Sequence, residues 1–171
     1  VALLMPNRPV FAVCYYAALQ LGAVVMPLHA RSTGPEVAFA LQDAGATALI
    51  SVSPLHAAAI QGWRAAGGDC RLILIGMDDE VALPPPTHRL ETLLDAVTEA
   101  DAASMAIQPV AEEADAVILF TSGTTDRPKG VRLSHRNLHA IAPQFAELCS
   151  LEPDDVLLLF MPATTIVGQI L

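Results

Sequence analysis

Short apolar segments alternate with longer segments of helical periodicity in the first half of the chain, and this alternation most constrains its fold. Helices are expected between the strands, over 7–21, 32–45 and 54–66. Strands that alternate with helices predict a layered α/β fold, a doubly wound sheet with helices on both faces. The segments that predict the strands are 1–5, 24–26, 48–52 and 72–75.

One stretch imitates a membrane span. Val10 to Leu28 contains nineteen residues and no charge. It also contains Gly22 and Pro27, which favour a helix that ends near Gly22, followed by a buried strand. We therefore predict a helix and a strand of a covered parallel sheet, and no transmembrane segment.

Local signals set several helix boundaries. Asn7 and Pro9 are typical of a helix start, because proline is tolerated in the first turn. Ser32 is predicted to cap the second helix, with Glu36 in its first turn. Gly67 and the glycine that follows it predict the end of the third helix.

The second half opens with an acidic, proline-rich stretch. Residues 78–115 are expected to form an exposed connection, with one weak helix near 90–97. Beyond it, 116–120 and 131–133 are strand-like. Ser134 is predicted to cap a helix that runs to about Cys149, and 156–160 is predicted to be a buried strand.

A polar run, TSGTTDRPKG from Thr121 to Gly130, separates the two strand-like flanks. Its Lys129 is the only lysine among nine cationic residues. Small hydroxyl residues and glycine let backbone N–H groups approach an anion closely, and a lysine adds a mobile positive charge. The run therefore favours a grip for a polyphosphate, with a flexible polar hairpin loop as the alternative.

The spacing differs from the commonest phosphate-binding loop. A Walker A loop places its second glycine directly before the lysine and opens a helix. Here five residues separate Gly123 from Lys129, and Gly130 follows the lysine. Because both flanks are strand-like, the loop is predicted to join two strands.

Charge is distributed unevenly. The formal net charge of −9 argues against nucleic acid as a partner. Residues 119–140 nevertheless carry four positive charges and one negative charge, in a chain whose other segments are neutral or acidic. A local basic segment fits an anionic ligand, although Arg132 and Arg136 are expected to be solvated surface charges.

The cysteines and histidines predict no metal site. Cys14, Cys70 and Cys149 lie far apart and form no Cys-x-x-Cys pair. Cys14 and Cys149 fall in apolar helical patterns, which indicates reduced core residues of a cytoplasmic protein. His135 and His139 are four residues apart, but no third ligand accompanies them, so capping and packing are favoured over zinc.

The longer string LFTSGTTDRPKGVRLSHRNL, residues 119–138, resembles the signature of the adenylate-forming superfamily. This superfamily includes acyl-CoA synthetases, adenylation domains of peptide synthetases and luciferase-like enzymes. The opening of the chain, with GAVVMP at Gly22 to Pro27, resembles the start of acyl-CoA synthetases. The matching signature positions are Thr121, Ser122, Gly123, Thr124, Thr125, Pro128, Lys129, Gly130, Val131, Ser134 and His135.

The resemblance implies roles for this loop. In the family the loop wraps the β and γ phosphates of ATP and the leaving pyrophosphate. The implied nucleotide-binding residues of this chain are Thr121, Ser122, Gly123, Thr124, Thr125 and Lys129. No catalytic residue is implied, because the family's remaining functional segments match nothing here.

Two departures from the family pattern bear on function. Asp126 stands where the family usually has glycine, which places a carboxylate near the expected triphosphate. In the tail, Ala163, Thr164 and Thr165 replace the Leu-Phe-His of a segment that borders the acyl and thiol channels in the family. These departures leave the acyl substrate open.

The resemblance implies a fragment of an ATP-dependent acid–thiol ligase. The whole chain, 1–171, is expected to be part of the large N-terminal AMP-binding domain, without the small C-terminal domain. Within it we expect a scaffold (1–77), an acidic connection (78–115) and a phosphate-loop segment (116–171). The parent enzyme is expected to activate a medium- or long-chain carboxylate with ATP and Mg²⁺ and to pass it to a thiol, CoA. The alternatives are an amino-acid-adenylating domain and a diverged, non-catalytic nucleotide- or protein-binding module.

Overall fold

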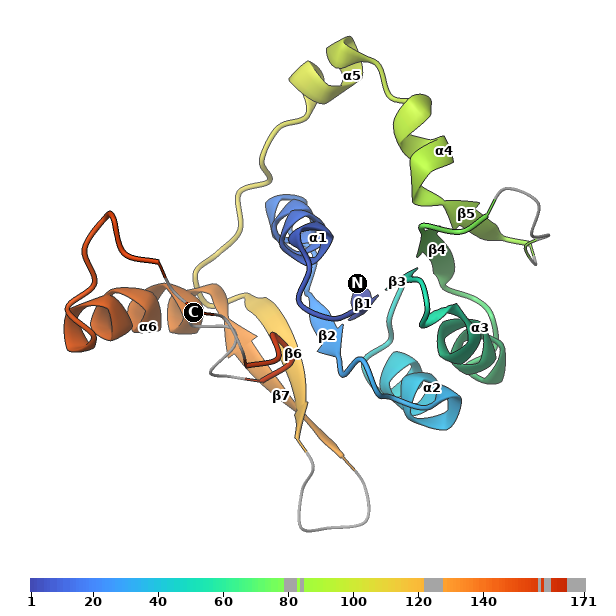
Figure 1. Ribbon diagram of the computed structural model, residues 1–171, viewed down its shortest axis with the longest axis horizontal. Helices are drawn as coiled ribbons and strands as arrows, with labels where there is room; N and C mark the ends of the chain where they lie inside the picture. Colours follow the sequence, from blue (N-terminus) through green and yellow to red (C-terminus); the bar gives the residue numbers. More distant parts are fainter. Residues whose placement is uncertain (79–82, 84, 122–127, 157, 159–160, 166–171) are drawn as a thin grey trace.

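The computed structural model describes residues 1–78, 83, 85–121, 128–156, 158 and 161–165 (Figure 1). Its main sheet has five parallel strands in the order β2-β1-β3-β4-β5. The central strands are mostly apolar, as expected of strands that are covered on both faces, although β3 contains the buried Ser51. The strands are β1 (Ala2–Leu4), β2 (Met26–Leu28), β3 (Ala48–Val52), β4 (Arg71–Ile75) and β5 (Thr87–Arg89).

An antiparallel hairpin continues this sheet. It consists of β6 (Asp115–Thr121) and β7 (Lys129–Ser134). The N–H of Val25 donates to the carbonyl of Ala116 at 2.8 Å, and the N–H of Ile118 donates to the carbonyl of Val25 at 2.9 Å. The hairpin therefore attaches next to β2, and the prediction that the polar loop joins two strands is confirmed.

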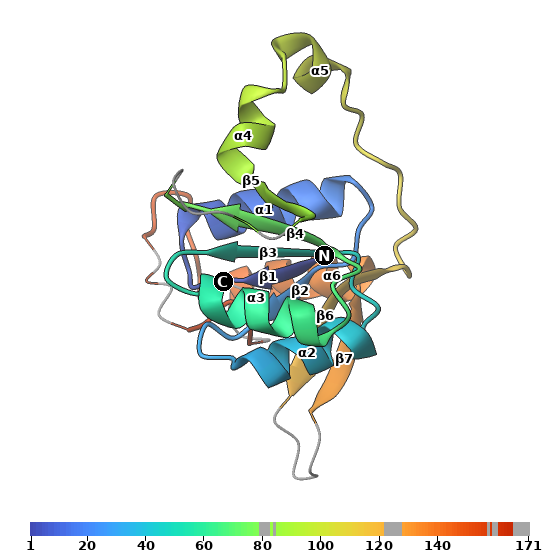
Figure 2. The ribbon, with the colours of Figure 1, turned by 90° about the vertical axis from the view of Figure 1, so that its right-hand side faces the viewer.

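Helices cover both faces of the sheet, which confirms the predicted layered α/β fold (Figure 2). Helices α2 and α3 pack on one face, against Leu4, Leu49 and Leu74. Helix α1 packs on the other face, against Leu3 and Val117. The helices are α1 (Pro9–Gln20), α2 (Gly34–Asp43), α3 (His56–Ala65), α4 (Leu90–Asp95), α5 (Glu99–Ser104) and α6 (His135–Leu148).

The apolar run from Val10 to Leu28 divides into α1 and β2, as predicted. Gly22 has a positive φ of 72°, and the N–H of Ala23 bonds back to the carbonyl of Ala18 at 3.0 Å. The predicted strand over 24–26 is displaced to Met26–Leu28, and Val25, just before it, bridges in parallel to Val117 of β6.

The start of α2 differs from the prediction by one residue. Thr33, and not Ser32, occupies the N-cap, and it forms a capping box with Glu36. The Glu36 carboxylate accepts from the Thr33 N–H at 2.7 Å and from the Thr33 hydroxyl at 2.9 Å. A capping box needs the carboxylate residue three positions after the cap, and Thr33 meets that spacing with Glu36. Ser32 instead closes a turn, because its N–H donates to the His29 carbonyl at 2.8 Å.

Proline is at the predicted position in α1, but asparagine is not part of the helix. Pro9 lies in the first turn and Arg8 occupies the N-cap. Asn7 precedes the cap and bonds to a distant segment instead.

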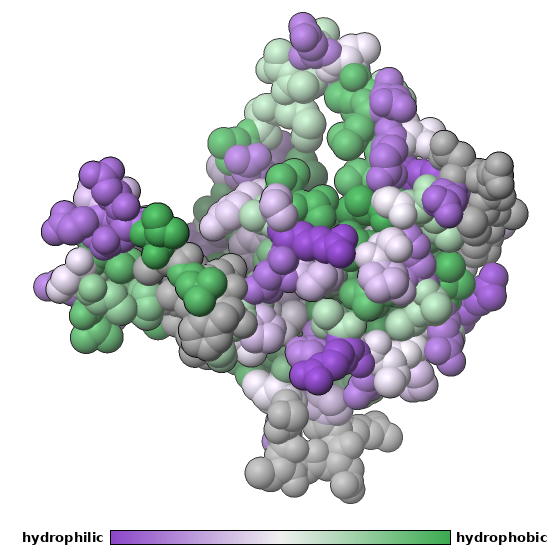
Figure 3. Space-filling model, viewed as in Figure 1, coloured by the Kyte–Doolittle hydropathy of each residue, from purple (hydrophilic) through white to green (hydrophobic). Residues whose placement is uncertain are grey.

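The acidic connection contains more structure than predicted. The weak helix is present as α4, and β5 and α5 were missed. Helix α5 is stabilised by a capping box between Thr98 and Asp101. Helices α4 and α5 stand away from the sheet in both ribbon views (Figures 1 and 2), and hydrophobic surface is visible in the same part of the space-filling view (Figure 3). Leu94 and Met105 are exposed in this segment.

The predicted buried strand over 156–160 is wrong for the residues that can be described. Val156 and Leu158 are 95% and 81% exposed, and neither belongs to a strand. The other three positions lie outside the described residues. An apolar run forms a buried strand only where neighbouring elements cover it, and the described part of the chain does not cover these two side chains.

Helix α6 begins at the predicted cap. The Ser134 hydroxyl accepts from the Asn137 N–H at 3.2 Å, and the Asn137 side chain closes a capping box. Cys149 follows the helix and is exposed, so the predicted core position is wrong for this cysteine and right for the buried Cys14. None of the described helices combines the length and the apolar character that a membrane crossing requires.

Candidate nucleotide-binding edge

The candidate site lies where parallel strands end. Met5 follows β1, His29 follows β2, and Thr121 is the last residue of β6. These strands run in the same direction, since β1 pairs in parallel with β2 and Val25 bridges in parallel to β6. The carboxyl edge of a parallel sheet is the usual place for ligands in open α/β folds.

The β6–β7 hairpin brings the two ends of the polar run together at this edge. Thr121 and Lys129 are cross-strand partners, and the Thr121 hydroxyl donates to the Lys129 carbonyl at 3.4 Å. The other four predicted nucleotide-binding residues, Ser122, Gly123, Thr124 and Thr125, lie outside the described residues, as does Asp126.

The base of the hairpin is fixed by a close packing contact. Gly130 pairs with Phe120, and a Cβ on Gly130 would lie 3.1 Å from Cγ2 of Ile118 and 3.5 Å from the Phe120 ring. The Phe120 ring meets the Phe39 ring of α2 edge-on, with 6.0 Å between centroids. A glycine at 130 therefore lets the base of the hairpin pack against α2. This packing fixes the backbone position of the neighbouring Lys129.

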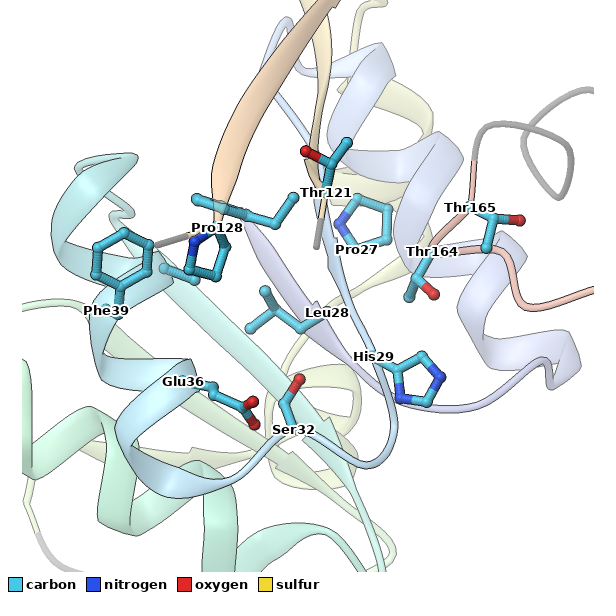
Figure 4. Close-up of a pocket in the computed structure, with 12 residues that line it drawn as sticks. Pro27, Leu28, His29, Ser32, Glu36, Phe39, Thr121, Pro128, Thr164 and Thr165 are labelled. Carbon is cyan, nitrogen blue, oxygen red and sulfur yellow. The ribbon is translucent and has the colours of Figure 1, made fainter. Parts of the chain in front are cut away.

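A pocket of about 350 Å³ adjoins the hairpin base (Figure 4). Thr121 and Pro128, the residues on either side of 122–127, both contribute to its wall. Its floor and walls come from the end of β2, the first turns of α2, the hairpin and the tail. The lining residues are Pro27, Leu28, His29, Ser32, Glu36, Phe39, Ala40, Phe120, Thr121, Pro128, Thr164 and Thr165.

A second pocket, of about 410 Å³, lies on the other side of His29 and Thr164. These two residues line both pockets. The second pocket is otherwise formed by the chain after β1 and by Ala30, Arg31 and Pro162.

The acidic residue of the first pocket is already engaged. The pKa of Glu36 is lowered, first by the hydrogen bond from the Thr33 N–H and then by that from the Thr33 hydroxyl. The Glu36 carboxylate is thus ionised at neutral pH and tied to the start of α2. Helix capping therefore accounts for the one carboxylate among the described residues that line this pocket.

The basic segment divides into paired and unpaired charges. Arg132 is 71% exposed and pairs with Asp115 at 2.6 Å, and Arg136 is 61% exposed and pairs with Glu112 at 3.2 Å. The hydrogen bond to Asp115 raises the pKa of Arg132 further. Both arginines are surface charges, as predicted. Among the residues that the structure describes, no carboxylate pairs with Lys129.

The tail segment is placed by Asn7, which the sequence indicated only as part of a helix start. The Asn7 amide donates to the Met161 carbonyl at 2.8 Å, and its oxygen accepts from the Ala163 N–H at 2.9 Å. Ala163 is buried, while Thr164 and Thr165 line the pocket. The departures noted at these two threonines therefore lie in the wall of the candidate site. A two-bond bridge between residues more than 150 positions apart leaves no sequence signal.

The two histidines of α6 lie elsewhere. His135 and His139 line a separate pocket with Glu112. Among the residues that the structure describes, no group of three or more His, Cys, Asp or Glu side chains could hold a metal ion.

A sheet edge with an anion-ready lysine and a pocket beside it defines a nucleotide-binding α/β protein. The model of the AMP-binding enzyme family matches residues 1–171, and the chain belongs to that family. The predicted family and fold class are both confirmed.

Relatives and solved structures agree. The chain is 34% identical to the long-chain-fatty-acid–CoA ligase FadD13 of Mycobacterium tuberculosis, over 95% of this chain and 30% of the relative. It is 33% identical to a crotonobetaine/carnitine–CoA ligase of Escherichia coli, over 95% of this chain and 31% of the relative. The chain thus spans about a third of the length of these relatives.

The structure is similar to the crystal structure of the long-chain-fatty-acid–CoA ligase FadD1 of Archaeoglobus fulgidus. The TM-score is 0.81 at 26% identity, over 98% of this chain and 31% of that one. An acyl-CoA synthetase of Brucella canis gives a TM-score of 0.83 at 18% identity, over 99% of this chain and 29% of that one, and supports the fold alone.

Proposed function

We propose that the full-length protein containing this chain is an acid–CoA ligase. It would activate a carboxylate with ATP as an acyl-adenylate, release pyrophosphate, and pass the acyl group to the thiol of CoA. The observation that carries the proposal is Lys129 at the hairpin base, which has no carboxylate partner among the described residues. It lies beside a pocket at the carboxyl edge of the sheet, in a chain of the AMP-binding enzyme family.

The hairpin's role follows from its chemistry. Lys129 supplies positive charge, and Thr121 begins a run of hydroxyl and glycine residues whose N–H groups suit phosphate oxygens. Together they would hold the β and γ phosphates in line for displacement and stabilise charge on the leaving pyrophosphate. Mg²⁺ is expected to accompany the ATP, and no described residue is assigned to it.

The substrate class is inferred from the relatives. One acts by name on long-chain fatty acids and the other on crotonobetaine or carnitine. We infer a medium- or long-chain fatty acid for this protein, in the cytoplasm. The threonines at 164 and 165 lie in the pocket wall, where the family usually has aromatic and histidine side chains, so the chain length of the acyl substrate stays open.

The test uses carboxylate-dependent exchange between ATP and labelled pyrophosphate. The full-length protein should catalyse exchange with a fatty acid and, after addition of CoA, yield the acyl-CoA. Exchange with amino acids alone would favour the amino-acid-adenylating alternative. Nucleotide binding without exchange would favour the non-catalytic one.

The isolated chain of residues 1–171 is expected to be inactive. The described residues would contribute to a grip for the β and γ phosphates, and none of them is assigned a role at the α-phosphate, where the substrate carboxylate attacks. Exchange by the purified chain with any carboxylate would contradict this assignment.

A further inference from the structure

The strongest unexplained contact is the bridge from Asn7 to the tail. Asn7 lies between β1 and α1, and its side chain bonds to Met161 and Ala163, which are 154 and 156 residues away. One planar amide thereby serves a carbonyl and an N–H two residues apart, as a neighbouring strand would. The bridge uses a donor and an acceptor on two separate atoms of one short side chain, which the asparagine amide provides.

The anchor on the Asn7 side is rigid. The preceding Met5 is 2% exposed, and Pro6 fixes the backbone between them. On the other side Arg8 caps α1, and its carbonyl accepts from the Phe11 N–H at 2.8 Å. The position of the Asn7 amide is therefore set by the sheet and by the helix start.

The bridge holds a compact turn. The Thr165 N–H donates to the Pro162 carbonyl at 2.9 Å, and the Thr165 hydroxyl donates to the same oxygen at 2.8 Å. Ala163, whose N–H bonds to Asn7, is 5% exposed. Thr164, within this turn, is directed to both pockets, and Figure 4 shows it beside His29 and across from Pro128.

We propose that Asn7 is a positioning residue that anchors the turn at 162–165 and thereby sets Thr164 as the wall between the two pockets. It acts through Thr164 and not on the substrate itself. Thr121 and Pro128 line the first pocket together with Thr164. A displaced Thr164 would therefore alter the space next to the hairpin that is proposed to bind phosphate. The kinetic part of this inference rests on the proposed function, whereas its structural part does not.

The test uses the full-length protein with Asn7→Ala and Asn7→Asp. Amide hydrogen exchange of the peptide containing Ala163 should be about three- to tenfold faster in Asn7→Ala, the loss expected for a hydrogen bond of ordinary strength. In the pyrophosphate exchange assay, KM for ATP should rise about three- to tenfold while kcat changes less than about twofold. Asn7→Asp keeps the acceptor for the Ala163 N–H and lacks the donor for the Met161 carbonyl. Its KM for ATP should therefore lie between that of the wild type and that of Asn7→Ala.

Asn137→Ala is the matched control. Asn137 is also an exposed asparagine whose side chain bonds to backbone, at the start of α6. Its loss should lower the melting temperature without changing KM for ATP or the exchange of Ala163.

The outcomes separate the possibilities. Unchanged exchange at Ala163 in Asn7→Ala would overturn the anchor. Faster exchange with an unchanged KM for ATP would overturn the positioning role and leave a structural one. A wild-type protein without carboxylate-dependent activity would refute the proposed function, and the exchange of Ala163 would still decide the anchor.

Discussion

Thr121 and Lys129 face each other across the last pair of the β6–β7 hairpin, joined by a 3.4 Å hydrogen bond from the Thr121 hydroxyl to the Lys129 carbonyl. This bond uses the backbone carbonyl of Lys129, and no carboxylate of the described residues pairs with its ammonium group. The same pair fixes the two ends of the polar run at the carboxyl edge of the sheet. It places Lys129 next to Thr121 and Pro128, which both line the pocket.

Replacement of Lys129 by alanine in the full-length protein should lower adenylation about ten- to hundredfold. A charge-assisted contact to phosphate contributes about 1.5–3 kcal/mol, which corresponds to that factor. Binding of the carboxylate should change less, since the lysine is expected to contact only phosphate. The measurement is pyrophosphate exchange at varied ATP and varied carboxylate.

Arg132→Ala serves as the control for this lysine. Arg132 is also a cation of β7, but it pairs with Asp115 and is 71% exposed. Exposed ion pairs contribute about 0–1 kcal/mol, so adenylation should change by less than about fivefold. Equal losses in the two variants, or none in Lys129→Ala, would remove the lysine from the assigned role.

Asp126→Gly should tighten the binding of ATP. Asp126 stands in the polar run where the family usually has glycine, so its carboxylate is expected to repel the triphosphate. The gain should shrink at high salt, because exposed charges are screened over about 10 Å at 0.1 M. Calorimetric titration of both full-length proteins at two salt concentrations measures it. Equal affinities would place Asp126 away from the phosphates, and weaker binding by the glycine variant would indicate that Asp126 helps to hold Mg²⁺.

Local signals predicted most of the fold. The strand at Ala48–Val52 and the Ser134 cap followed from patterns that are complete within a few residues. The errors arose where contacts between residues far apart in the sequence determine the local structure. The run at 156–160 is apolar enough for a buried strand, yet Val156 is exposed because burial depends on partners that a local pattern does not specify.

The site was predicted in part for the same reason. The polar run marked Thr121 and Lys129, and the structure brings them together as neighbours. The pocket beside them draws on His29 and Thr164, which come from opposite ends of the chain. Their proximity depends on sheet topology and on the Asn7 bridge, so no single window of sequence contains it.

Gly62→Ala should destabilise the protein, against the usual direction for a helix interior. Alanine ordinarily stabilises a helix by about 1 kcal/mol relative to glycine. In α3, however, a Cβ on Gly62 would lie 2.5 Å from Cβ of Val37 and 2.8 Å from the carbonyl oxygen of Gly34. Overpacking of this kind costs about 1–3 kcal/mol, so a net loss is expected in thermal unfolding.

Ala57→Gly tests the propensity term alone. Ala57 is an exposed position of the same helix, and glycine there should cost about 0.5–1 kcal/mol. A higher melting temperature for Gly62→Ala would show that α2 and α3 separate without cost.

His56→Gln should flatten the dependence of stability on pH. Burial lowers the pKa of His56 from its ordinary 6.5, and this effect exceeds the opposing hydrogen bonds to the Ile75 and Ser51 backbone and the charge of Glu91. A lowered pKa means that the folded protein favours the neutral imidazole, so the unfolded chain takes up its proton first as the pH falls. The stabilisation is complete above pH 6.5 and is lost as the pH falls through the lower, folded pKa.

Melting temperatures of the wild type and of His56→Gln, from about pH 7.5 to about pH 5, measure this contribution. Carboxylates that titrate in both proteins largely cancel in the comparison. The wild type should lose more stability than the variant over this interval. Parallel profiles would show that His56 is as well solvated when folded as when unfolded, and a steeper fall in the variant would reverse the assigned sign.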